Sequence, residues 1–416
     1  MIIRASVPGS VRLVADLLTV EAALARVLEH ARPLAAEAVS LWDCAGRALA
    51  EDARAVVELP PFPSSAMDGF ALRSASTPGT LRIAGRIAAG RPATRPLEPG
   101  EAMGIATGGV VPVGADAVVP LELVTDREDE VHVDQPVSLG ANIREMGGDA
   151  RRGETIAAQG AILAPHRLAA LAATGVATVR CYRRPRVAIL TTGTELRPPG
   201  EPLERGQIYE SNGVMLEALL VGAGAVVRRL RTVVDSLEAH RAALTDAFAD
   251  DVVVSSGGVS VGPHDLVRRV GRELGVEELF WGVAVRPGKP LSFGARGATL
   301  VFGLPGNPVS SLVGAILFVL PALRALQGVR SPEPRFQAGT TTLALARNAA
   351  RDDFARARLE LLADGTASLS PVGGQESHMI ASAAMADALV HVPRGGGSIA
   401  PGESVRYLPL DLASGA

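Results

Sequence analysis

The stretch DVVVSSGGVSVGPHD, from Asp251 to Asp265, carries an apolar run straight into a glycine-rich turn. The three valines predict a short buried strand, and a helix is expected after the turn. A strand that leads through such a turn into a helix is typical of a phosphate-binding loop. The Gly-Lys-Ser/Thr ending of a nucleotide P-loop is missing, however. The stretch therefore indicates an α/β unit, and by itself it is compatible with either a phosphate-binding loop or an ordinary turn.

The same alternation of apolar runs and helical patterns extends to both sides of this stretch. Predicted strands cover 187–191, 225–230, 251–255, 280–285, 291–293 and 299–302, and predicted helices cover 213–221, 237–249, 264–274 and 308–327. Strands that alternate with helices at this spacing favour a doubly wound, parallel sheet with helices on both faces.

The segments on either side of this region lack the regular alternation of strands and helices. Helices are expected over 20–30 and 165–174, and short strands over 81–87, 102–106, 117–121 and 131–133. After a linker at 331–334, further strands are expected over 358–362, 367–369, 389–392 and 404–408. The segment 302–323 has no charged residue, but Pro305 and Pro308 interrupt it. We therefore expect a buried core helix there rather than a membrane span.

Composition excludes several classes of protein. The 416 residues allow about two to four domains, and 47% hydrophobic with 20% charged residues is typical of a soluble globular protein. A formal net charge of −3 and 3% aromatic residues provide neither a basic surface nor a stacking platform for nucleic acid. Cys44 and Cys181 form no CxxC pair, which fits a reducing cytoplasm, and the N-terminus has no apolar run typical of a signal peptide.

Four loops follow predicted strands and are expected to meet at one edge of the sheet, where open α/β sheets bind ligands. They are TTGTEL with Glu195, SSGGVSVGPHD, RPGKP with Arg286 and Lys289, and GLPGNPVS with Asn307. The Ser255–Gly258 backbone can approach an anion, and the two cations suit phosphate. Asn307 as N-cap, with Pro308 after it, leaves the next helix N–H groups free for a ligand or a cap. One such loop could be ordinary turn chemistry, but four predict a site for a phosphate-bearing ligand.

A second group of candidate residues lies in the β-rich region before residue 150. PPFPSSAMDGFAL carries Asp68, IATGGVVPVGADAVV carries Thr107, and NIREMGGDARRG carries Asp149. A carboxylate in a Gly/Ser loop is usually only an Asx-turn. If this region met the phosphate loops, an acidic lining would form from Asp68, Asp149, Glu195, Asp235 and Asp265. Such a lining beside cationic loops suggests a divalent, oxygen-bound metal such as Mg²⁺.

Other chemistries find no support in the sequence. The 7 histidines show no HxH or HxxxH spacing for zinc, and no GxSxG nucleophile elbow occurs. The glycines around Gly193 do not form the GxGxxG motif of a dehydrogenase.

At these residues the chain resembles the MoeA family, the molybdopterin molybdenumtransferases, whose eukaryotic relatives include the gephyrin E domain. The matching stretches follow the family's order from about Leu18 to Pro409: PPFPSSAMDGFA, IATGGVVPVGADAVV, NIREMGGDARRGE, TGTEL, GQIYESN, SSGGVSVGPHD, RPGKP, GLPGNPVS and GGQESHM. The resemblance implies a multi-domain α/β and β fold. Its parts are an elongated first domain (18–56 and 139–180), a β-rich second domain (57–138), a doubly wound, molybdopterin-binding α/β domain (181–329) and a β-barrel-like fourth domain (330–416).

The resemblance also implies a reaction, in which adenylylated molybdopterin and molybdate react with Mg²⁺ present, AMP is released, and molybdenum stays on the pterin dithiolene. The residues implied as catalytic are Asp68, Thr107, Asp149, Glu195 and Lys289. The residues implied in binding pterin phosphate or molybdate are Ser255, Ser256, Gly257, Gly258, Ser260, Arg286, Pro305, Gly306, Asn307, Pro308 and Ser377. The implied metal ligands are Glu195, Asp235 and Asp265.

Members of the family form homodimers, with the active cleft between the third domain of one subunit and the second domain of its partner. Asp68 and Thr107 are therefore expected to act in trans. Four positions depart from the family pattern, and two of them, Phe70 and Leu266, each replace a common tyrosine. Arg286 replaces a lysine, so a planar guanidinium group with several fixed donors replaces a compact ammonium charge. Thr194 stands where many relatives carry aspartate, which would weaken a metal ligand.

Three other functions compete with this one. The first is adenylylation of molybdopterin, performed by single-domain relatives of the third domain; the two β-rich domains and the SAMDG stretch speak against it. The second is a gephyrin-like scaffold, for which a fused adenylyltransferase domain and a long linker would be expected. The third is a tungsten-handling paralogue, which the sequence does not separate from a molybdenum enzyme. Expected partners are a molybdopterin adenylyltransferase and apo-molybdoenzymes, with no nucleic acid or membrane, in the cytoplasm.

Overall fold

The computed structural model describes residues 17–230, 232–258 and 265–411. The chain divides into two compact units, each with its own core. Unit 1 comprises 1–37, 46–48 and 182–416, and unit 2 comprises 38–45 and 49–181. Ser260, predicted to bind ligand, lies outside the described residues.

Unit 1 is built on a six-stranded sheet in the order β16-β13-β17-β21-β20-β18. The strands are β13 Arg186–Thr191, β16 Val226–Arg229, β17 Val252–Ser256, β18 Glu277–Trp281, β20 Ser292–Arg296 and β21 Thr299–Leu304. The first four strands in this order are parallel, whereas β20 is antiparallel to both of its neighbours. The carboxyl ends of β13, β17 and β21 therefore share one edge.

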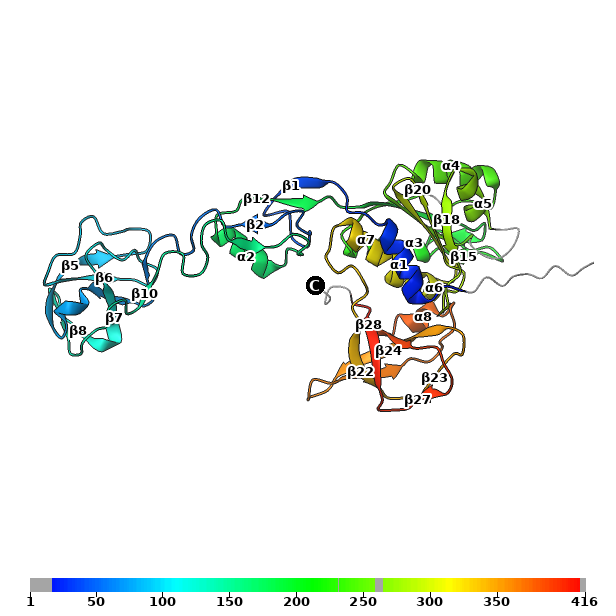
Figure 1. Cartoon of the computed structure of the whole chain (residues 1–416). Helices are drawn as coiled ribbons and strands as arrows, with labels where there is room; N and C mark the ends of the chain where they lie inside the picture. Colours follow the sequence, from blue (N-terminus) through cyan, green and yellow to red (C-terminus); the bar gives the residue numbers. More distant parts are fainter. Residues whose placement is uncertain (1–16, 231, 259–264, 412–416) are drawn as a thin grey trace, which may run out of the picture. The chain divides into compact units, whose positions relative to one another are not determined.

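Helices cover both faces of this sheet (Figure 1). They are α1 Val20–His30, α3 Asn212–Gly222, α4 Leu237–Ala247, α5 Leu266–Glu273, α6 Pro308–Gly314 and α7 Leu320–Leu326. Alternate residues of β13 point to opposite faces. Val187 and Ile189 share a core with α1, α3, α6 and α7, while Ala188 and Leu190 share one with α4 and α5. The predicted doubly wound α/β fold is confirmed.

The helical segment from α6 to α7 continues through a π-helical turn at Ala315–Val319. Pro308–Leu326 is long and apolar enough to cross a membrane, but 83% of it is buried within unit 1. It packs between the sheet and α1, so the expectation of a core helix agrees with its surroundings.

The C-terminal part of unit 1 is a closed barrel. Its strands are β22 Gln337–Thr341, β24 Asp352–Leu361, β25 Ala367–Pro371, β26 Ala388–Val392 and β28 Ser404–Pro409. The ring closes because β24 pairs with both β25 and β26. The two-residue strand β19, Val285–Arg286, joins this sheet in parallel with β24. The short pair β23 Leu345–Ala346 and β27 Ser398–Ile399, and helix α8 Ile380–Ala383, complete this part.

Unit 2 contains a six-stranded sheet in the order β7-β4-β6-β5-β9-β8. The strands are β4 Gly69–Leu72, β5 Gly79–Ile87, β6 Glu101–Ile105, β7 Ala117–Pro120, β8 Val124–Asp126 and β9 Glu130–Val133. Two cores flank it, one around Phe70 and one around Met103. Outside this sheet lie α2 Pro165–Ala173 and the short pairs β2 Ala53–Arg54 with β11 Thr155–Ala157, and β3 Ser64–Ser65 with β10 Ile143–Arg144.

One sequence expectation differs from the fold. The predicted strand 280–285 is wrong, because the sheet strand ends at Trp281 and Gly282 turns the chain with a φ of 86°. The apolar residues that follow lead into β19, which belongs to the barrel. The division into four domains stays a prediction.

Gly69 tests the packing of the sheet in unit 2. A Cβ at this position would lie 1.9 Å from the Val119 carbonyl oxygen, which is backbone and cannot rotate away. We expect Gly69→Ala to destabilise unit 2 by about 3 kcal/mol, seen as a lower urea midpoint. Gly222→Ala, where no atom lies within 4 Å of the added Cβ, is the control and should leave the midpoint unchanged or slightly raised. An unchanged midpoint for Gly69→Ala would contradict this packing.

Candidate functional site

The carboxyl ends of β13, β17 and β21 border a cavity of about 630 Å³, which we call the acidic cavity. Its polar lining residues include Thr191, Thr192, Glu195, Tyr209, Glu210, Ser211, Asn212, Asp235, Ser256, Asn307 and His378. Gly257, Gly258, Pro305, Gly306 and Pro308 also line it. Three of these side chains are carboxylates, and no lysine or arginine occurs among the described lining residues. All four of the predicted loops contribute to this cavity, the RPGKP loop through Pro290 alone.

Glu195 and Asp235 are the carboxylates of this cavity that remain available to a ligand. Neither side chain has a hydrogen bond or ion pair within the described part of the chain. Gly193 allows the Glu195 carboxylate to fold back against the loop, because a Cβ there would lie 2.8 Å from its oxygens. Glu210 differs, since its Oε1 accepts the Gly213 N–H at 2.7 Å at the start of α3.

The floor of the acidic cavity is a buried hydrogen-bond network. Asn212 Nδ2 donates to Ser256 Oγ and to the Gly306 carbonyl oxygen, each at 2.8 Å. Gly257 packs against Thr192, where a Cβ would lie 2.8 Å from Thr192 Oγ1. Asn212 Oδ1 is buried without a hydrogen-bond partner in the described residues. Because such an acceptor costs free energy unless it is paired, it is suited to an N–H or O–H group of a ligand.

Two predicted residues of the same strand and turn lie elsewhere. Ser255 is fully buried and donates to the Phe302 carbonyl oxygen within the sheet. Asp265 caps α5 by accepting the Arg268 N–H, and it also forms an ion pair with the Arg268 guanidinium at 2.6 Å. Burial raises the pKa of Asp265 although Arg268 opposes this shift. Neither residue is among the described residues that line the acidic cavity.

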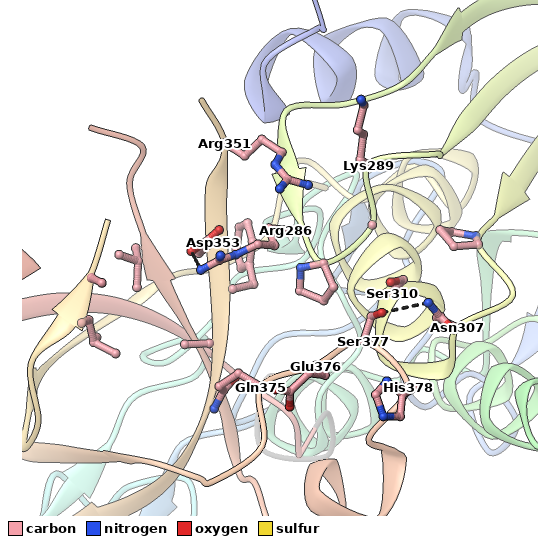
Figure 2. A pocket seen from close by; sticks show the side chains of 18 of the residues that line it. Arg286, Lys289, Asn307, Ser310, Arg351, Asp353, Gln375, Glu376, Ser377 and His378 are labelled. Atoms are coloured by element: carbon pink, nitrogen blue, oxygen red, sulfur yellow. Dashed lines mark hydrogen bonds and ion pairs between the residues drawn. The ribbon is translucent and has the colours of Figure 1, made fainter. Parts of the chain in front are cut away.

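A second cavity of about 820 Å³, the cationic cavity, shares lining residues with the first. Figure 2 shows the side chains that line the cationic cavity. It lies between the loop after β19 and the barrel, and the cations among its lining residues are Arg286, Lys289 and Arg351. Arg286 forms an ion pair with the buried Asp353, its register partner across β19 and β24. Burial raises the pKa of Asp353, and Arg286 opposes this. Within the described residues, the Lys289 and Arg351 side chains have no ion-pair partner, so both charges are available to an anion.

Asn307 and Ser377 connect the two cavities. Asn307 occupies the N-cap position of α6, but its side chain makes no capping bond and instead donates to Ser377 Oγ at 2.8 Å. The Val309 N–H donates to the Ser377 carbonyl oxygen at 3.1 Å. The Val309 N–H is thus taken by a cap from the barrel loop, which is one of the two uses expected for the N–H groups after Asn307. Pro290, Pro305, Asn307 and His378 line both cavities.

The candidate residues of unit 2 form one bonded pair and one separate residue. Asp68 precedes β4 and Thr107 follows β6, and these strands pair so that Gly69 is opposite Ile105. Asp68 Oδ1 accepts the Thr107 N–H at 2.7 Å and its hydroxyl at 3.1 Å. Both bonds lower the pKa of Asp68, because they favour its ionised form, and the bond from the Thr107 N–H has the larger effect. Asp149 is exposed, and no bond joins it to this pair in the described residues.

Many residues of the two cavities had no predicted role, and four of them carry charged or polar side chains of interest: Glu210, Asn212, Arg351 and His378. Glu210 and Asn212 lie in the stretch GQIYESN, and His378 lies in GGQESHM, so the signal was present but no chemistry was attached to it. Arg351 lies in no such stretch and reaches the cavity only through the pairing of β24 with β19.

A Mg²⁺ ion is compatible with the acidic cavity but not with a cage made wholly of protein. No group of three or more His, Cys, Asp or Glu side chains poised for a metal occurs among the described residues. Mg²⁺ is usually held by one or two carboxylates together with substrate phosphates and water. Glu195 and Asp235 match that donor set, whereas both oxygens of Asp265 already have protein partners.

Family models match three successive parts of the chain. Residues 18–175 match the MoeA N-terminal region (domain I and II), 188–325 a probable molybdopterin binding domain, and 338–410 the MoeA C-terminal region (domain IV). A protein of Haemophilus influenzae named molybdopterin molybdenumtransferase is 35% identical, and the alignment covers 95% of this chain and 99% of that protein. The chain belongs to the MoeA family. The resemblance inferred from its motifs is confirmed.

Further relatives agree with this membership. Molybdopterin molybdenumtransferase 2 of Mycobacterium tuberculosis is 36% identical over 93% of this chain and 97% of its own length. The solved structure of a molybdopterin biosynthesis MoeA protein from Pyrococcus horikoshii superposes with a TM-score of 0.82 at 28% identity, covering 95% of this chain and 100% of that one. The predicted multi-domain MoeA fold is confirmed by this likeness.

The Asp68–Thr107 pair makes a prediction about ionisation. Thr107→Val removes the hydroxyl bond but keeps the N–H bond, so the pKa of Asp68 should rise only part of the way to its ordinary value. Thr107→Ser, which keeps both bonds, is the control and should leave the pKa low. Because the folded pKa lies below the unfolded one, the stabilisation is present above the unfolded pKa and is lost as pH falls through the folded pKa. A carbon-13 NMR titration of the carboxyl group decides; equal values in both variants would contradict the pairing.

Proposed function

We propose that this chain is a molybdopterin molybdenumtransferase, which inserts molybdate into adenylylated molybdopterin and releases AMP in molybdenum cofactor biosynthesis. The observation that carries the proposal is the cationic cavity adjoining the acidic cavity at the strand ends of a MoeA-family chain. Relatives of nearly the same length at 35–36% identity bear that name.

The cationic cavity suits the two anions of this reaction, molybdate and the pterin phosphate. Lys289 and Arg351 form no ion pair in the described residues, although the charge of Arg351 also acts on Asp353, whereas Arg286 pairs directly with Asp353. Guanidinium and ammonium groups in a partly enclosed cavity bind oxyanions through charge-assisted hydrogen bonds. Lys289 and Arg351 would therefore make the main contacts, and Arg286 would mainly join the loop to the barrel.

Glu195 and Asp235 would hold a Mg²⁺ ion whose charge offsets that of the substrate phosphates. This pair is favoured over Asp265, because the latter is engaged by Arg268. Asn212 Oδ1, buried and unpaired in the described residues, would accept a hydrogen bond from the organic part of the substrate. Glu195 and Asp235 also lie where a carboxylate could hold protons during the loss of oxo groups from molybdate.

We also propose that the enzyme is a homodimer with a shared cleft, in which Asp68, Thr107 and Asp149 of one subunit complete the cavities of the other. Support comes from the family pattern and from the Asp68–Thr107 pair, whose two hydrogen bonds hold the carboxylate and the hydroxyl group side by side. A cytoplasmic location is proposed as well, with a molybdopterin adenylyltransferase as donor of substrate and apo-molybdoenzymes as acceptors of product.

The first test follows AMP release from purified protein with adenylylated molybdopterin, Mg²⁺ and molybdate. We expect that AMP is released only when molybdate is present and that the product reactivates an apo-molybdoenzyme. The absence of both results would contradict the proposal. Parallel assays with tungstate in place of molybdate, and with molybdopterin and ATP, test the tungsten and adenylyltransferase alternatives. A chain that binds its partners but turns over neither substrate would instead be a scaffold.

Subunit mixing tests the shared cleft. Asp68→Ala and Lys289→Ala should each lower the rate by at least about 100-fold, because each removes a charge from the site. Heterodimers of the two variants should regain activity, since one of their two clefts would contain both native residues. If mixing restores nothing although exchange of subunits is demonstrated, the trans arrangement is wrong.

A metal titration tests the acidic cavity. The variant Glu195→Gln with Asp235→Asn keeps the shape of both side chains but removes both charges. We expect the Mg²⁺ concentration for half-maximal AMP release to rise at least about 10-fold. Glu238→Gln, an exposed carboxylate in the first turn of α4, is the control and should not change it. Direct Mg²⁺ or Mn²⁺ binding by calorimetry in the presence of AMP should change in parallel.

A further inference from the structure

Arg356 in β24 is a charged side chain buried inside the barrel part of unit 1. It is 1% exposed and is among the largest fully buried side chains. Its guanidinium donates to backbone carbonyl oxygens only. Nη1 donates to Met379 at 2.8 Å, while Nη2 donates to Gly374 and, at 3.2 Å, to Glu376. No carboxylate forms an ion pair with it within the described residues.

These carbonyl groups belong to one segment, residues 373–379, which we call the Ser377 loop. Gln375 fixes the same segment to the backbone of Arg356. Its Oε1 accepts the Arg356 N–H at 3.0 Å, and its Nε2 donates to the Arg356 carbonyl oxygen at 3.0 Å. Both the side chain and the backbone of Arg356 therefore hold the Ser377 loop, which has no regular secondary structure of its own until α8.

The Ser377 loop reaches the border of the two cavities. Its Ser377 carbonyl oxygen accepts the Val309 N–H, and Ser377 Oγ accepts from Asn307 Nδ2. The next residue, His378, lines both cavities (Figure 2). Ser377 and His378 thus belong to a loop that Arg356 and Gln375 hold on the barrel side, with a further bond from Ser382 Oγ to the Gly373 carbonyl oxygen.

Burying a guanidinium without a carboxylate is costly, and an apolar side chain of similar volume would avoid this cost. Stability alone therefore gives no reason for an arginine here. A planar group with several donors in fixed directions can, however, hold three carbonyl oxygens in one arrangement, which an ammonium group cannot reproduce.

We propose that Arg356 is a positioning residue of the site, which sets the Ser377 loop so that Ser377 and His378 stand at the border of the acidic and cationic cavities. This inference rests on the proposed function for its kinetic test, but not for its structural one.

The structural test is hydrogen–deuterium exchange in Arg356→Lys, a change that keeps the positive charge but removes the planar guanidinium group with its several donors. We expect exchange to quicken about 10-fold or more in peptides covering 373–380 and also at Val309, whose N–H bonds to the loop from α6. Arg358→Lys is the matched control, because this arginine lies two residues further along β24 with an exposed side chain. Unchanged exchange at Val309 in Arg356→Lys would overturn the proposal.

The kinetic test asks whether Arg356 acts through the loop. Arg356→Lys should lower kcat/KM for AMP release by about 30-fold, since small misplacement of site groups has such effects. In a Ser377→Ala/His378→Ala background, Arg356→Lys should lower kcat/KM by less than about 3-fold, because the two residues through which Arg356 acts are already missing. Equal losses in both backgrounds would overturn the proposal.

Two further considerations separate a failure of this proposal from a failure to fold and from a failure of the proposed function. If Arg356→Lys does not fold, Gln375→Ala removes the second anchor of the same loop and must give the same pattern of exchange and non-additivity. If the wild-type protein releases no AMP, the proposed function fails, while the exchange experiment still decides whether Arg356 holds the loop.

Discussion

The parallel ladder of β13, β17 and β21 is the constraint on which the rest of unit 1 depends. Its residues are buried on both faces, so its backbone bonds are protected and its direction is set by two cores at once. Because the three strands run in the same direction, the loops after them leave the sheet at one edge. The glycines of these loops, above all Gly257 against Thr192, allow the backbones to approach closely enough to form one cavity.

The two adjoining cavities differ in the charge that they leave available to a ligand. In the acidic cavity, Glu195 and Asp235 have no partner among the described residues. The cationic cavity contains the carboxylates Asp353 and Glu376 as well as Arg286, Lys289 and Arg351, so its cations outnumber its carboxylates. An extended substrate with both a metal-binding phosphate and an oxyanion partner is matched by this arrangement, because one cavity has an excess of carboxylates and the other an excess of cations.

Much of the fold follows from periodicity along the chain. Val252–Val254 and the helical pattern after Leu237 were recognisable from the sequence. Apolar residues recur there at the spacing that places them on the buried faces of a strand or a helix. β4 was not recognisable, because GFAL is too short for a period and becomes a buried strand only through pairing with β6 and β7. The run after Trp281 was misread for a similar reason: the residues before and after Gly282 enter different sheets.

The sequence by itself determined the family, the α/β class and the strand-end loops that border the two cavities, because motifs and hydrophobic periods are local properties of the chain. Only the tertiary structure decided which charged groups are available to a ligand. Arg286 and Asp265 have the residue types of ligand-binding groups, yet Asp353 and Arg268 already pair with them. Lys289, Glu195 and Arg351 have no such partner in the part of the chain that is described. Availability depends on neighbours in space, and for Arg286 that neighbour is 67 residues away along the chain.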